Sequence, residues 1–369
     1  MSAIPLVDLR AQYEAHRSEI DAALSHAIGG AHFIGGPDHE AFARDFGAFC
    51  GGLEVALCGN GTDALCLALL ETLGNGDGSG EVVTVSHTFA ATAEAIVSAG
   101  YLPVFVDVDE KACLMDVEKV EAVIGPRTRA IVPVHLYGQM VPMDALSAVA
   151  ARHGLPVIED AAQAHGATWR GRGPGAYSDA ACFSFFPSKN LGAWGDGGAV
   201  VTRKAALAAR IRARANHGRT SKYEHGVLGV NSRLDGIQAS VLRVKLRHLA
   251  RANERRREVA SWYVELLADI PAVRLPLARA TAEHVYHLFV VQVKNRDGVL
   301  ARLREDGVEA GVHYPIPVHE QPAFQGLGIP PDALPITHRL ARDVLSLPLY
   351  PEISRAQVES VAAALRKAI

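Results

Sequence analysis

The sequence predicts an α/β fold, a three-layer sandwich in which a mostly parallel sheet lies between two layers of helices. Strand-like segments that each precede a helical pattern lie at about 82–85, 103–107 and 130–134. The helical patterns stop near Gly100, Gly125 and Gly154, and glycine is the residue that most often follows a helix. Strands that alternate with helices in this way build parallel sheets covered on both faces. Ligands bind at the carboxyl ends of such strands, so we expect functional residues just after each strand.

The N-terminal part predicts helices on either side of a loop. Residues 1–30 begin extended and become helical, and a glycine-rich loop follows at 33–37. Phenylalanines from Phe42 to Phe49 then recur at spacings of four and three, which is the apolar stripe of a helix. Residues 53–58 predict a short strand that leads into a tight turn and another helix.

The C-terminal part predicts a change of architecture. Expected strands lie at 199–202 and 289–293, and expected helices at 203–215, 233–268, 297–306 and from about Arg355. A loop is expected at 216–230, and a second, glycine-rich loop at 74–80 is interpreted as peripheral. We therefore expect a large domain over residues 1–245 and a smaller α+β domain over residues 246–369.

Composition excludes several classes of function. The chain has 369 residues, of which 49% are hydrophobic and 21% charged, as in globular proteins of about two domains. A net charge of −3 gives no basic excess for binding nucleic acid. The N-terminus lacks the pattern of a signal peptide, and no apolar run is long enough to span a membrane.

The cysteines and histidines predict neither disulfides nor a metal site. Five cysteines are scattered along the chain and never form a C-x-x-C motif, which is typical of reduced thiols in a cytoplasmic protein. The sixteen histidines show no metal-binding spacing such as H-E-x-x-H. We therefore expect a cytoplasmic protein without a metal ion.

Lys189 is a single lysine in the apolar and aromatic run Ser184–Gly192. Burial disfavours the charged form of a lysine and lowers its pKa, which makes the amine a nucleophile able to form a Schiff base with a carbonyl. The alternative is a lysine at the tip of a β-turn with its ammonium group in water.

Other strand ends carry polar groups. The turn at 59–63 opens a helix and forms either an anion site with free backbone N–H groups or an ordinary helix cap. Asp160 ends an apolar strand and is either a cap or the partner of a cationic ring nitrogen. Phe89 is either a core residue or an aromatic that stacks on a planar ligand. The hydroxyl of Ser184 is placed to bind phosphate.

These features together describe one ligand. An amine, a carboxylate for a ring nitrogen, a stacking aromatic and a phosphate site are the requirements of pyridoxal 5′-phosphate. A nicotinamide dehydrogenase is the alternative from the fold, but no G-x-G-x-x-G motif follows the first strand.

Seven motifs resemble those of the DegT/DnrJ/EryC1/StrS sugar aminotransferases, which are fold type I pyridoxal phosphate enzymes similar in fold to aspartate aminotransferase. They occur in the order typical of that family and lie at 33–37, 61–65, 88–92, 133–138, 159–163, 185–192 and 229–235. The resemblance covers nearly the whole chain.

The resemblance implies a role for each site residue. Lys189 is the Schiff-base lysine, Asp160 faces the pyridine nitrogen, Gln163 approaches the ring hydroxyl and Phe89 stacks on the ring. The implied phosphate site consists of Gly61, Thr62, Asp63 and Ser184, with Asn231 contributed by the neighbouring subunit of a homodimer with shared active sites. His313 and Tyr314 are implied near the sugar, and Arg233 either meets a substrate anion or forms a structural ion pair with Asp235 or a neighbour.

The resemblance also implies a reaction. L-Glutamate is the expected amino donor and a nucleotide-linked keto-sugar the acceptor. The motif around Lys189 is similar to that of members that aminate C3 of a dTDP-3-keto-6-deoxyhexose or a UDP-3-keto-hexuluronate. Lys189 stands where dehydrating members carry histidine, which argues against dehydration. His165, often phenylalanine in relatives, is interpreted as pocket wall or core.

Three alternatives stay open at this point. The chain could aminate C4 of a keto-sugar, it could act on a cyclitol or form an aminobenzoate precursor, or it could bind the cofactor as a regulator without turnover.

Overall fold

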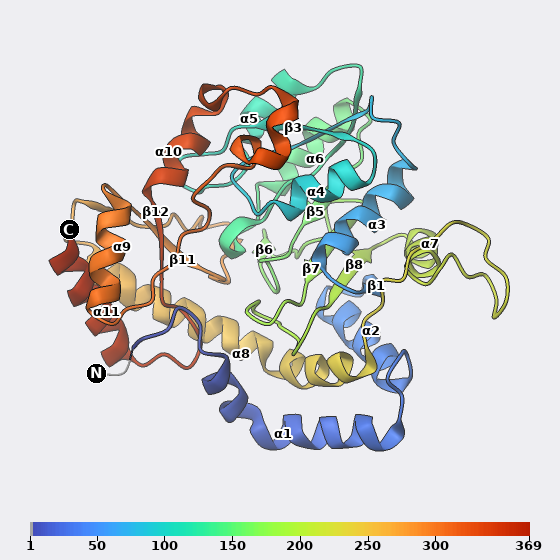
Figure 1. Ribbon diagram of the computed structural model, residues 1–369, viewed down its shortest axis with the longest axis horizontal. Helices are drawn as coiled ribbons and strands as arrows, with labels where there is room; N and C mark the ends of the chain where they lie inside the picture. The colour runs from blue at the N-terminus through green and yellow to red at the C-terminus, as the bar shows by residue number, and fades with distance from the viewer. Residues whose placement is uncertain (1–2) are drawn as a thin grey trace.

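The computed structural model describes residues 3–369 as an α/β protein with a mixed sheet (Figure 1). One set of paired strands has the order β1 (Glu54–Cys58), β8 (Gly198–Thr202), β7 (Ala180–Ser184) and β5 (Ile158–Asp160). A second set has the order β3 (Leu102–Val106), β2 (Glu81–Val85) and β4 (Thr128–Ile131). The strands predicted from the sequence occur here, with bounds that shift by up to a few residues.

The two sets adjoin through β4 and β5. Parallel bridges pair Ile131 with Val157 and Val134 with Asp160, so the strands follow the order β3-β2-β4-β5-β7-β8-β1. Strand β2 is parallel to both of its neighbours and β5 is parallel to β7, whereas β8 is antiparallel to both β7 and β1. The predicted parallel character is therefore confirmed for most of the sheet, and β8 is the exception.

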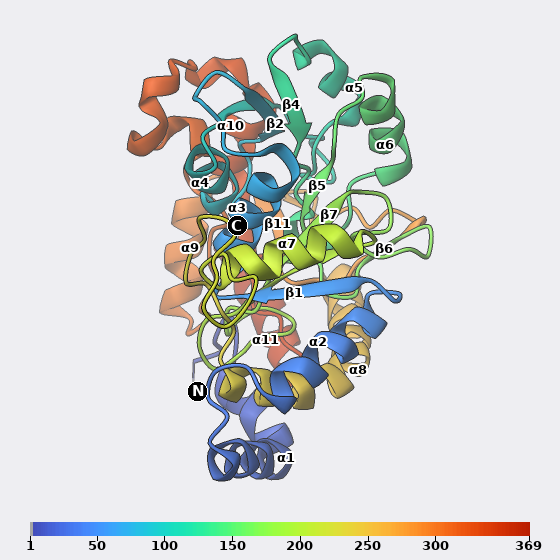
Figure 2. The same cartoon turned by 90° about the vertical axis from the view of Figure 1, so that its right-hand side faces the viewer.

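The two faces of the sheet bury different side chains. In β1, Val55 and Leu57 join one buried cluster together with Phe42 of α2 (Pro37–Phe49). Ala56 joins another cluster together with Leu65 of α3 (Gly61–Leu73). Successive side chains of a strand point to opposite faces, which explains how five residues supply two cores. Helix α7 (Ala205–Ala215) packs on β1 and β8 on the same side as α3 (Figure 2).

Glycines end two of the predicted helices. Helix α4 (Ala91–Ser98) and helix α6 (Met143–Arg152) are followed by Gly100 and Gly154, whose φ angles of 85° and 63° lie in the left-handed region that glycine tolerates best. These two ends confirm the prediction.

The prediction for the helix before Gly125 is wrong. Helix α5 (Val117–Val120) has only one turn and continues as a 3₁₀ turn over Glu121–Val123. The preceding residues form a loop, because the Asp109 carboxylate accepts hydrogen bonds from the backbone N–H groups of Lys111 and Ala112. Such side-chain acceptors compete with helical hydrogen bonds.

The C-terminal part has its own buried cluster. Its elements are α8 (Gly236–Leu267), β9 (Val273–Arg274), β11 (Phe289–Val293), α9 (Arg296–Glu305), α10 (Pro335–Asp343), β12 (Val344–Leu347) and α11 (Arg355–Ala368). Tyr263, Phe289 and Leu345 are among the cluster's fully buried side chains. Helix α1 (Leu9–Gly30) packs along α8 (Figure 1), and before α1 the chain pairs with the C-terminal part through a parallel bridge between Ile4 and Val308.

Several short elements had no clear pattern in the sequence. They are β6 (Thr168–Trp169), β10 (Ala282–Glu283) and 3₁₀ turns over Leu136–Gly138, Val318–Glu320, Pro322–Leu327 and Pro331–Ala333. Among residues 3–369, no helix combines the length and the hydrophobicity needed to cross a bilayer.

Candidate active site

A cavity of about 400 Å³ lies where several strands of the sheet end. Its wall contains residues from the segments that follow β1, β2, β4, β5 and β7, and it is completed by His313 and Tyr314 from the C-terminal part. The site expected from the sequence therefore lies at the carboxyl ends of the strands, as the fold class requires.

Lys189 projects into this cavity from a turn. Its backbone N–H donates to the Phe186 carbonyl over 2.8 Å, so the predicted β-turn is present. The side chain is half-buried and lines the cavity. Burial of the amine lowers the pKa of Lys189 to about 8, and the charge of Asp160 acts in the opposite direction. Within the described part of the chain, the amine has no hydrogen-bond or ion-pair partner. These are the properties of an amine available for chemistry.

Asp160 ends β5 and is buried beside the same cavity. Its Oδ2 accepts a hydrogen bond from the Thr92 hydroxyl over 2.7 Å, and its Oδ1 accepts one from the Ala162 N–H over 3.1 Å. Burial raises the pKa of this carboxyl group, and the two donors oppose that effect. A carboxylate in this position is stabilised by a cationic group in the cavity.

The N-terminus of α3 lines the cavity next to the end of β7. Asn60 caps the helix by accepting the Asp63 N–H over 2.8 Å. A Cβ atom on Gly61 would lie 2.6 Å from the Ser184 Cβ atom, so only glycine lets the helix approach the end of β7 this closely. The N–H groups of Gly61 and Thr62 have no partner among the described residues. Two free donors, a nearby hydroxyl and the helix dipole make an anion site.

Asp63 does not line the cavity with its side chain. Its Oδ2 accepts a hydrogen bond from the Ser232 hydroxyl over 2.6 Å, while Ser232 Oγ also accepts the Gly59 N–H over 2.9 Å. Since the Asp63 N–H is already bound by Asn60, the direct contribution of Asp63 to an anion site is small in this chain.

Aromatic and amide groups close the cavity on another side. Phe89 is 57% exposed and its ring centroid lies 5.6 Å from that of Tyr314, so it is not a core residue. Gln163 accepts the Tyr137 N–H over 2.6 Å with Oε1, and its Nε2 donates to the Tyr314 hydroxyl over 3.2 Å. The orientation of this amide is thereby fixed, and its NH₂ group is directed to the Tyr314 side.

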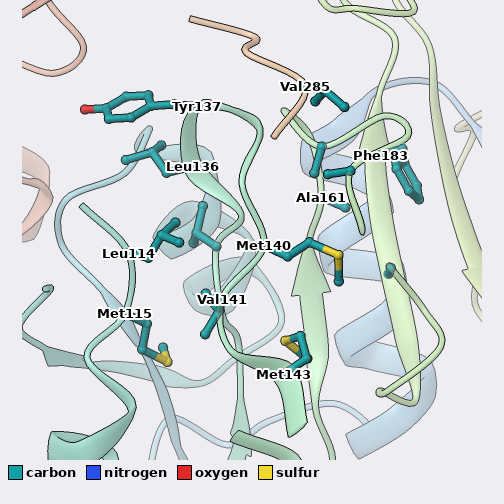
Figure 3. Packing of buried hydrophobic residues seen from close by; sticks show 14 of the residues in the cluster. Leu114, Met115, Leu136, Tyr137, Met140, Val141, Met143, Ala161, Phe183 and Val285 are labelled. Carbon is teal, nitrogen blue, oxygen red and sulfur yellow. The ribbon is translucent and has the colours of Figure 1, made fainter. Parts of the chain in front are cut away.

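The segment behind Gln163 is anchored in the main core. Leu136, Tyr137 and Val141 lie in one buried cluster together with Met143, as Figure 3 shows. The hydroxyl of Tyr137 also donates to the His313 carbonyl. This anchor joins the strand-end loops to the C-terminal part at the cavity.

The His313 ring is oriented by a hydrogen bond to a serine of β12. Its Nδ1 lies 2.8 Å from the Ser346 hydroxyl, and burial together with Lys189 lowers the pKa of His313 to about 4. The ring is therefore neutral near pH 7 and acts as a hydrogen-bonding group.

Asn231 and Arg233 lie away from the cavity of their own chain. Asn231 is exposed and bridges to Asn216, and Arg233 donates to the Asn216 side chain over 3.0 Å. Among the described residues, Arg233 forms no ion pair with Asp235, so that alternative is not supported.

His165 belongs to the core. It is fully buried, and its ring lies 5.2 Å from Phe183 and 5.9 Å from Phe185 between ring centroids.

Several polar residues at the site were given no role from the sequence, and three of them hold or flank the reacting groups. These three are Thr92, which binds Asp160, and His135 and His287, which line the cavity. His135 donates with Nε2 to the buried Glu159 carboxylate, because its Nδ1 accepts the Val141 N–H. A lone histidine after a strand gives no spacing signal by which this role could be recognised.

One trio of possible metal ligands occurs in the described chain, namely His16, Glu19 and His248. The two imidazole rings stack with an interplanar angle of 18° and their centroids 4.1 Å apart, so their in-plane nitrogen lone pairs run nearly parallel and do not converge on a nearby point. Glu19 is in addition bound by Arg247 over 2.8 Å. The arrangement does not suit a metal ion that needs converging nitrogen lone pairs.

Relatives with assigned names match almost the whole chain. The erythromycin biosynthesis sensory transduction protein EryC1 of Saccharopolyspora erythraea is 48% identical over 98% of this chain and 99% of its own length. The dTDP-3-amino-3,4,6-trideoxy-alpha-D-glucose transaminase of Streptomyces venezuelae is 45% identical, covering 99% and 96%. The UDP-N-acetyl-3-dehydro-alpha-D-glucosamine 3-aminotransferase of Acidithiobacillus ferrooxidans is 45% identical, covering 100% and 98%.

Solved structures agree with these matches. The crystal structure of DesV from S. venezuelae in complex with a ketimine intermediate has a TM-score of 0.97 at 45% identity, covering 100% of this chain and 98% of that one. The structure of NtdA from Bacillus subtilis with bound cofactor PMP has a TM-score of 0.93 at 31% identity, covering 100% and 85%. The model of the DegT/DnrJ/EryC1/StrS aminotransferase family matches residues 14–366. The chain therefore belongs to this family of aminotransferases, which work with pyridoxal 5′-phosphate.

Proposed function

We propose that this chain is a sugar aminotransferase that moves the amino group of L-glutamate to C3 of a nucleotide-linked keto-sugar. The names of the relatives support amination at position 3, since two of them are called 3-amino-sugar transaminases or 3-aminotransferases. Their nucleotides differ, dTDP in one and UDP in the other. The proposed acceptor is a dTDP-3-keto-6-deoxyhexose or a UDP-3-keto-hexuluronate. The second is supported by a 40% identical relative from Pseudomonas aeruginosa that is named UDP-2-acetamido-2-deoxy-3-oxo-D-glucuronate aminotransferase.

The single observation that carries the proposal is the half-buried Lys189 amine, which shares one cavity at the end of the sheet with the buried Asp160 carboxylate. The surrounding groups fit pyridoxal 5′-phosphate. Gly61 and Thr62 offer free N–H groups and Ser184 a hydroxyl to its phosphate, and the buried Asp160 gains a cationic partner in the pyridinium nitrogen.

The ring of the cofactor has further partners in the proposal. Phe89 is placed to stack on it, and the fixed NH₂ group of Gln163 is placed to donate to the ring hydroxyl. His313 and Tyr314 form the wall of the same cavity and are proposed to contact the sugar.

Bound pyridoxal 5′-phosphate supplies an aldehyde that carries the amino group and a ring that accepts electrons. Asp160 favours the protonated ring nitrogen by its negative charge. Lys189 removes the α-proton of the donor as a general base and returns it as a general acid, and its lowered pKa near 8 suits both tasks near neutral pH. In the second half-reaction the direction is reversed, and Lys189 would deliver a proton to C3 of the sugar as the general acid after taking one up as the general base.

The proposed active unit is a homodimer with shared active sites. Lys189 is the only lysine or arginine among the described residues that line the cavity, although a phosphate, a nucleotide diphosphate and a dicarboxylate must be bound. Asn231 and Arg233 point elsewhere in their own chain and are proposed to serve the site of a second copy. Leu228 and Tyr223, 90% and 82% exposed, support burial of their loop against that copy.

Two features of architecture belong to the same proposal. A three-layer sandwich is supported by the two buried clusters on opposite faces of the sheet. A division into residues 1–245 and 246–369 is supported by the separate C-terminal cluster, although the boundary falls inside α8. A cytoplasmic location is proposed from the free cysteines.

C4 or cyclitol amination and regulation without turnover are the competing functions. The name of EryC1 as a sensory transduction protein favours the regulator among these alternatives. A regulator would need no lysine with a lowered pKa, so Lys189 argues for turnover.

The test uses the purified full chain. We expect it to bind pyridoxal 5′-phosphate, to be labelled at Lys189 after borohydride reduction, and to form 2-oxoglutarate from L-glutamate with 3-keto but not 4-keto nucleotide sugars. Lys189→Ala should retain the cofactor and lose transfer, whereas the exposed Lys294→Ala should behave as wild type. A chain that takes up no cofactor, or that reacts only with a 4-keto sugar, would refute the proposal.

A further inference from the structure

His287 lies next to the Lys189 segment without being part of it. Its ring lines the cavity, and its backbone N–H donates to the Tyr137 carbonyl over 2.9 Å. No residue role discussed above requires a histidine at this position. The state of its two ring nitrogens follows from the hydrogen bonds around it.

The orientation of two buried amides is fixed by backbone carbonyls. Asn253 donates with Nδ2 to the His165 carbonyl over 2.8 Å, so its Oδ1 is an acceptor. Asn190 donates with Nδ2 to that Oδ1 over 2.9 Å and to the Val285 carbonyl over 3.0 Å. Both hydrogens of the Asn190 amide are used, and its Oδ1 therefore acts as an acceptor.

This acceptor determines the tautomer of His287. The Nδ1 atom of His287 lies 3.2 Å from Asn190 Oδ1 and must carry the proton to form a hydrogen bond. In a neutral imidazole the other nitrogen, Nε2, then has a free lone pair. Burial, followed by the positive charge of Lys189, lowers the pKa of His287 well below its usual value, so the ring stays neutral.

The free nitrogen faces the cavity. His287 Nε2 makes no hydrogen bond to any described residue. The atom is nevertheless not fully enclosed by protein, so a ligand or a side chain can reach it. The residue as a whole is 5% exposed, and it lines the active-site cavity. A neutral acceptor is thus presented to the same cavity as the Lys189 amine, and it is held there through Asn190, the residue that follows Lys189.

We infer that His287 is a positioning residue that accepts a hydrogen bond from Lys189 through its unprotonated Nε2. Lys189 must hold a proton between the two transfers of each half-reaction, in a site where Asp160 is the nearest opposite charge. A neutral acceptor stabilises the ammonium form without adding a second negative charge, and it directs the amine toward the reacting carbon. The inference rests on the proposed transamination.

Two substitutions separate this role from a structural one. An asparagine side chain reproduces the Nδ1 position of histidine and keeps the link to Asn190, whereas a glutamine reaches the Nε2 position and offers an oxygen acceptor there. His287→Asn should lose the contact with Lys189, and His287→Gln should retain much of it. If His287 only supported Asn190, His287→Asn would behave like wild type and His287→Gln would show the larger defect.

The measurement is the pKa of Lys189 in the full chain loaded with pyridoxamine 5′-phosphate, in which the lysine amine is free. The rate of reductive methylation of the Lys189 peptide, followed by mass spectrometry against pH, gives this pKa. Asp160, His165, His313 and Tyr314 also face Lys189 and are unchanged in both variants. Removing an acceptor of the ammonium form lowers the pKa of the amine, by about one to two units in His287→Asn.

The expected results are a lowered Lys189 pKa in His287→Asn, a value close to wild type in His287→Gln, and a matching shift of the acidic limb of the kcat profile, where the general base becomes protonated. Equal values in both variants, or a loss only in His287→Gln, would overturn the inference. Nitrogen-15 spectra of histidine in wild-type protein give a second measurement that needs no variant to fold. A protonated Nε2 of His287 would also overturn it, whereas a chain without cofactor uptake would instead refute the proposed function.

Discussion

The hydroxyl of Thr92 donates a hydrogen bond to the Asp160 carboxylate over 2.7 Å, and so connects helix α4 to the end of β5. The same hydroxyl lies 3.0 Å from that of Thr88, which makes a short chain of hydroxyl groups behind the carboxylate. Burial raises the pKa of Asp160, and the Thr92 bond is the strongest influence that lowers it. The charge that Asp160 brings to the cavity therefore depends on a residue outside the predicted site.

Thr92→Val should weaken cofactor binding. The substitution keeps the shape of the side chain but removes a hydrogen bond to a charged group, which contributes about 1.5–3 kcal/mol. The dissociation constant of pyridoxal 5′-phosphate, measured by absorbance titration, is expected to rise about ten-fold or more. Thr88→Val is the matched control, since Thr88 does not touch Asp160. Equal affinity of wild type and Thr92→Val would show that this bond does not support the carboxylate.

Lys189→Met should stabilise the cofactor-free chain near neutral pH. The pKa of Lys189 falls from 10.5 to about 8 on folding because the amine is buried. Between these values the unfolded chain binds more protons than the folded chain, so wild-type stability rises from pH 8 to pH 10.5. Below pH 8 the penalty of the buried charge is complete, and removing it should add about 1–3 kcal/mol.

Urea unfolding of both chains across this pH range measures the effect. The advantage of Lys189→Met is expected at pH 7 and should vanish as the pH approaches 10.5, the ordinary lysine value. Lys294→Met, which replaces an exposed lysine, should show no such pH dependence. A gain in Lys189→Met that persists unchanged at high pH would mean that the buried charge is not its cause.

Gly61→Ala should damage both stability and phosphate binding. Its new Cβ atom would lie 2.6 Å from the Ser184 Cβ atom, so either the helix start or the strand end must shift. Overpacking of this kind costs about 1–3 kcal/mol. Thermal unfolding and titration with pyridoxal 5′-phosphate are the two measurements, and we expect both the melting temperature and the affinity to fall.

A second glycine provides the comparison for Gly61→Ala. Gly29 lies in helix α1 with open space around its Cα, so Gly29→Ala meets no neighbour. Alanine is the better helix former, and this variant should be more stable by about 0.5–1 kcal/mol. If Gly61→Ala is tolerated as well as Gly29→Ala, the close approach of α3 to β7 is not required.

Local sequence patterns were sufficient to predict the main strands of the sheet and the edge of the sheet at which the cavity lies. Apolar strands followed by helical stripes identified β2 and β3, and the rule for parallel sheets located the cavity. Asp160 and Lys189 could be selected because a charged residue in an apolar run is unusual. The helix predicted before Gly125 is shorter than expected, because Asp109 competes for backbone donors in the preceding loop, which depends on loop geometry and not on periodicity.

The remaining site residues depend on contacts between distant segments. His287 reaches the cavity through Asn190, which is 97 positions away in the chain. Asp63 was expected to serve the phosphate site through its backbone, and no sequence pattern indicates that its carboxylate binds Ser232, 169 positions away. No spacing rule relates such pairs, because the sheet and α8 bring them together only after folding.

Two inactive variants should restore activity when mixed, if the active sites are shared. Lys189→Ala removes the reacting amine from one chain, and Asn231→Ala removes the group proposed to serve the second copy. In a mixed dimer, one site then combines an intact Lys189 with an intact Asn231, while the other site lacks both. After random exchange of subunits, half of the dimers are mixed, so about a quarter of wild-type activity should return.

The control is a mixture of the two variants in which the subunits have not exchanged. The variants are mixed at low temperature and assayed immediately. Activity should then stay at the sum of the separate variants and rise only as exchange proceeds. The exposed position of Asn231 and its distance from the cavity of its own chain are the reasons to expect complementation. If exchange is demonstrated by mass but no activity returns, Asn231 acts within its own subunit and each chain forms a complete site.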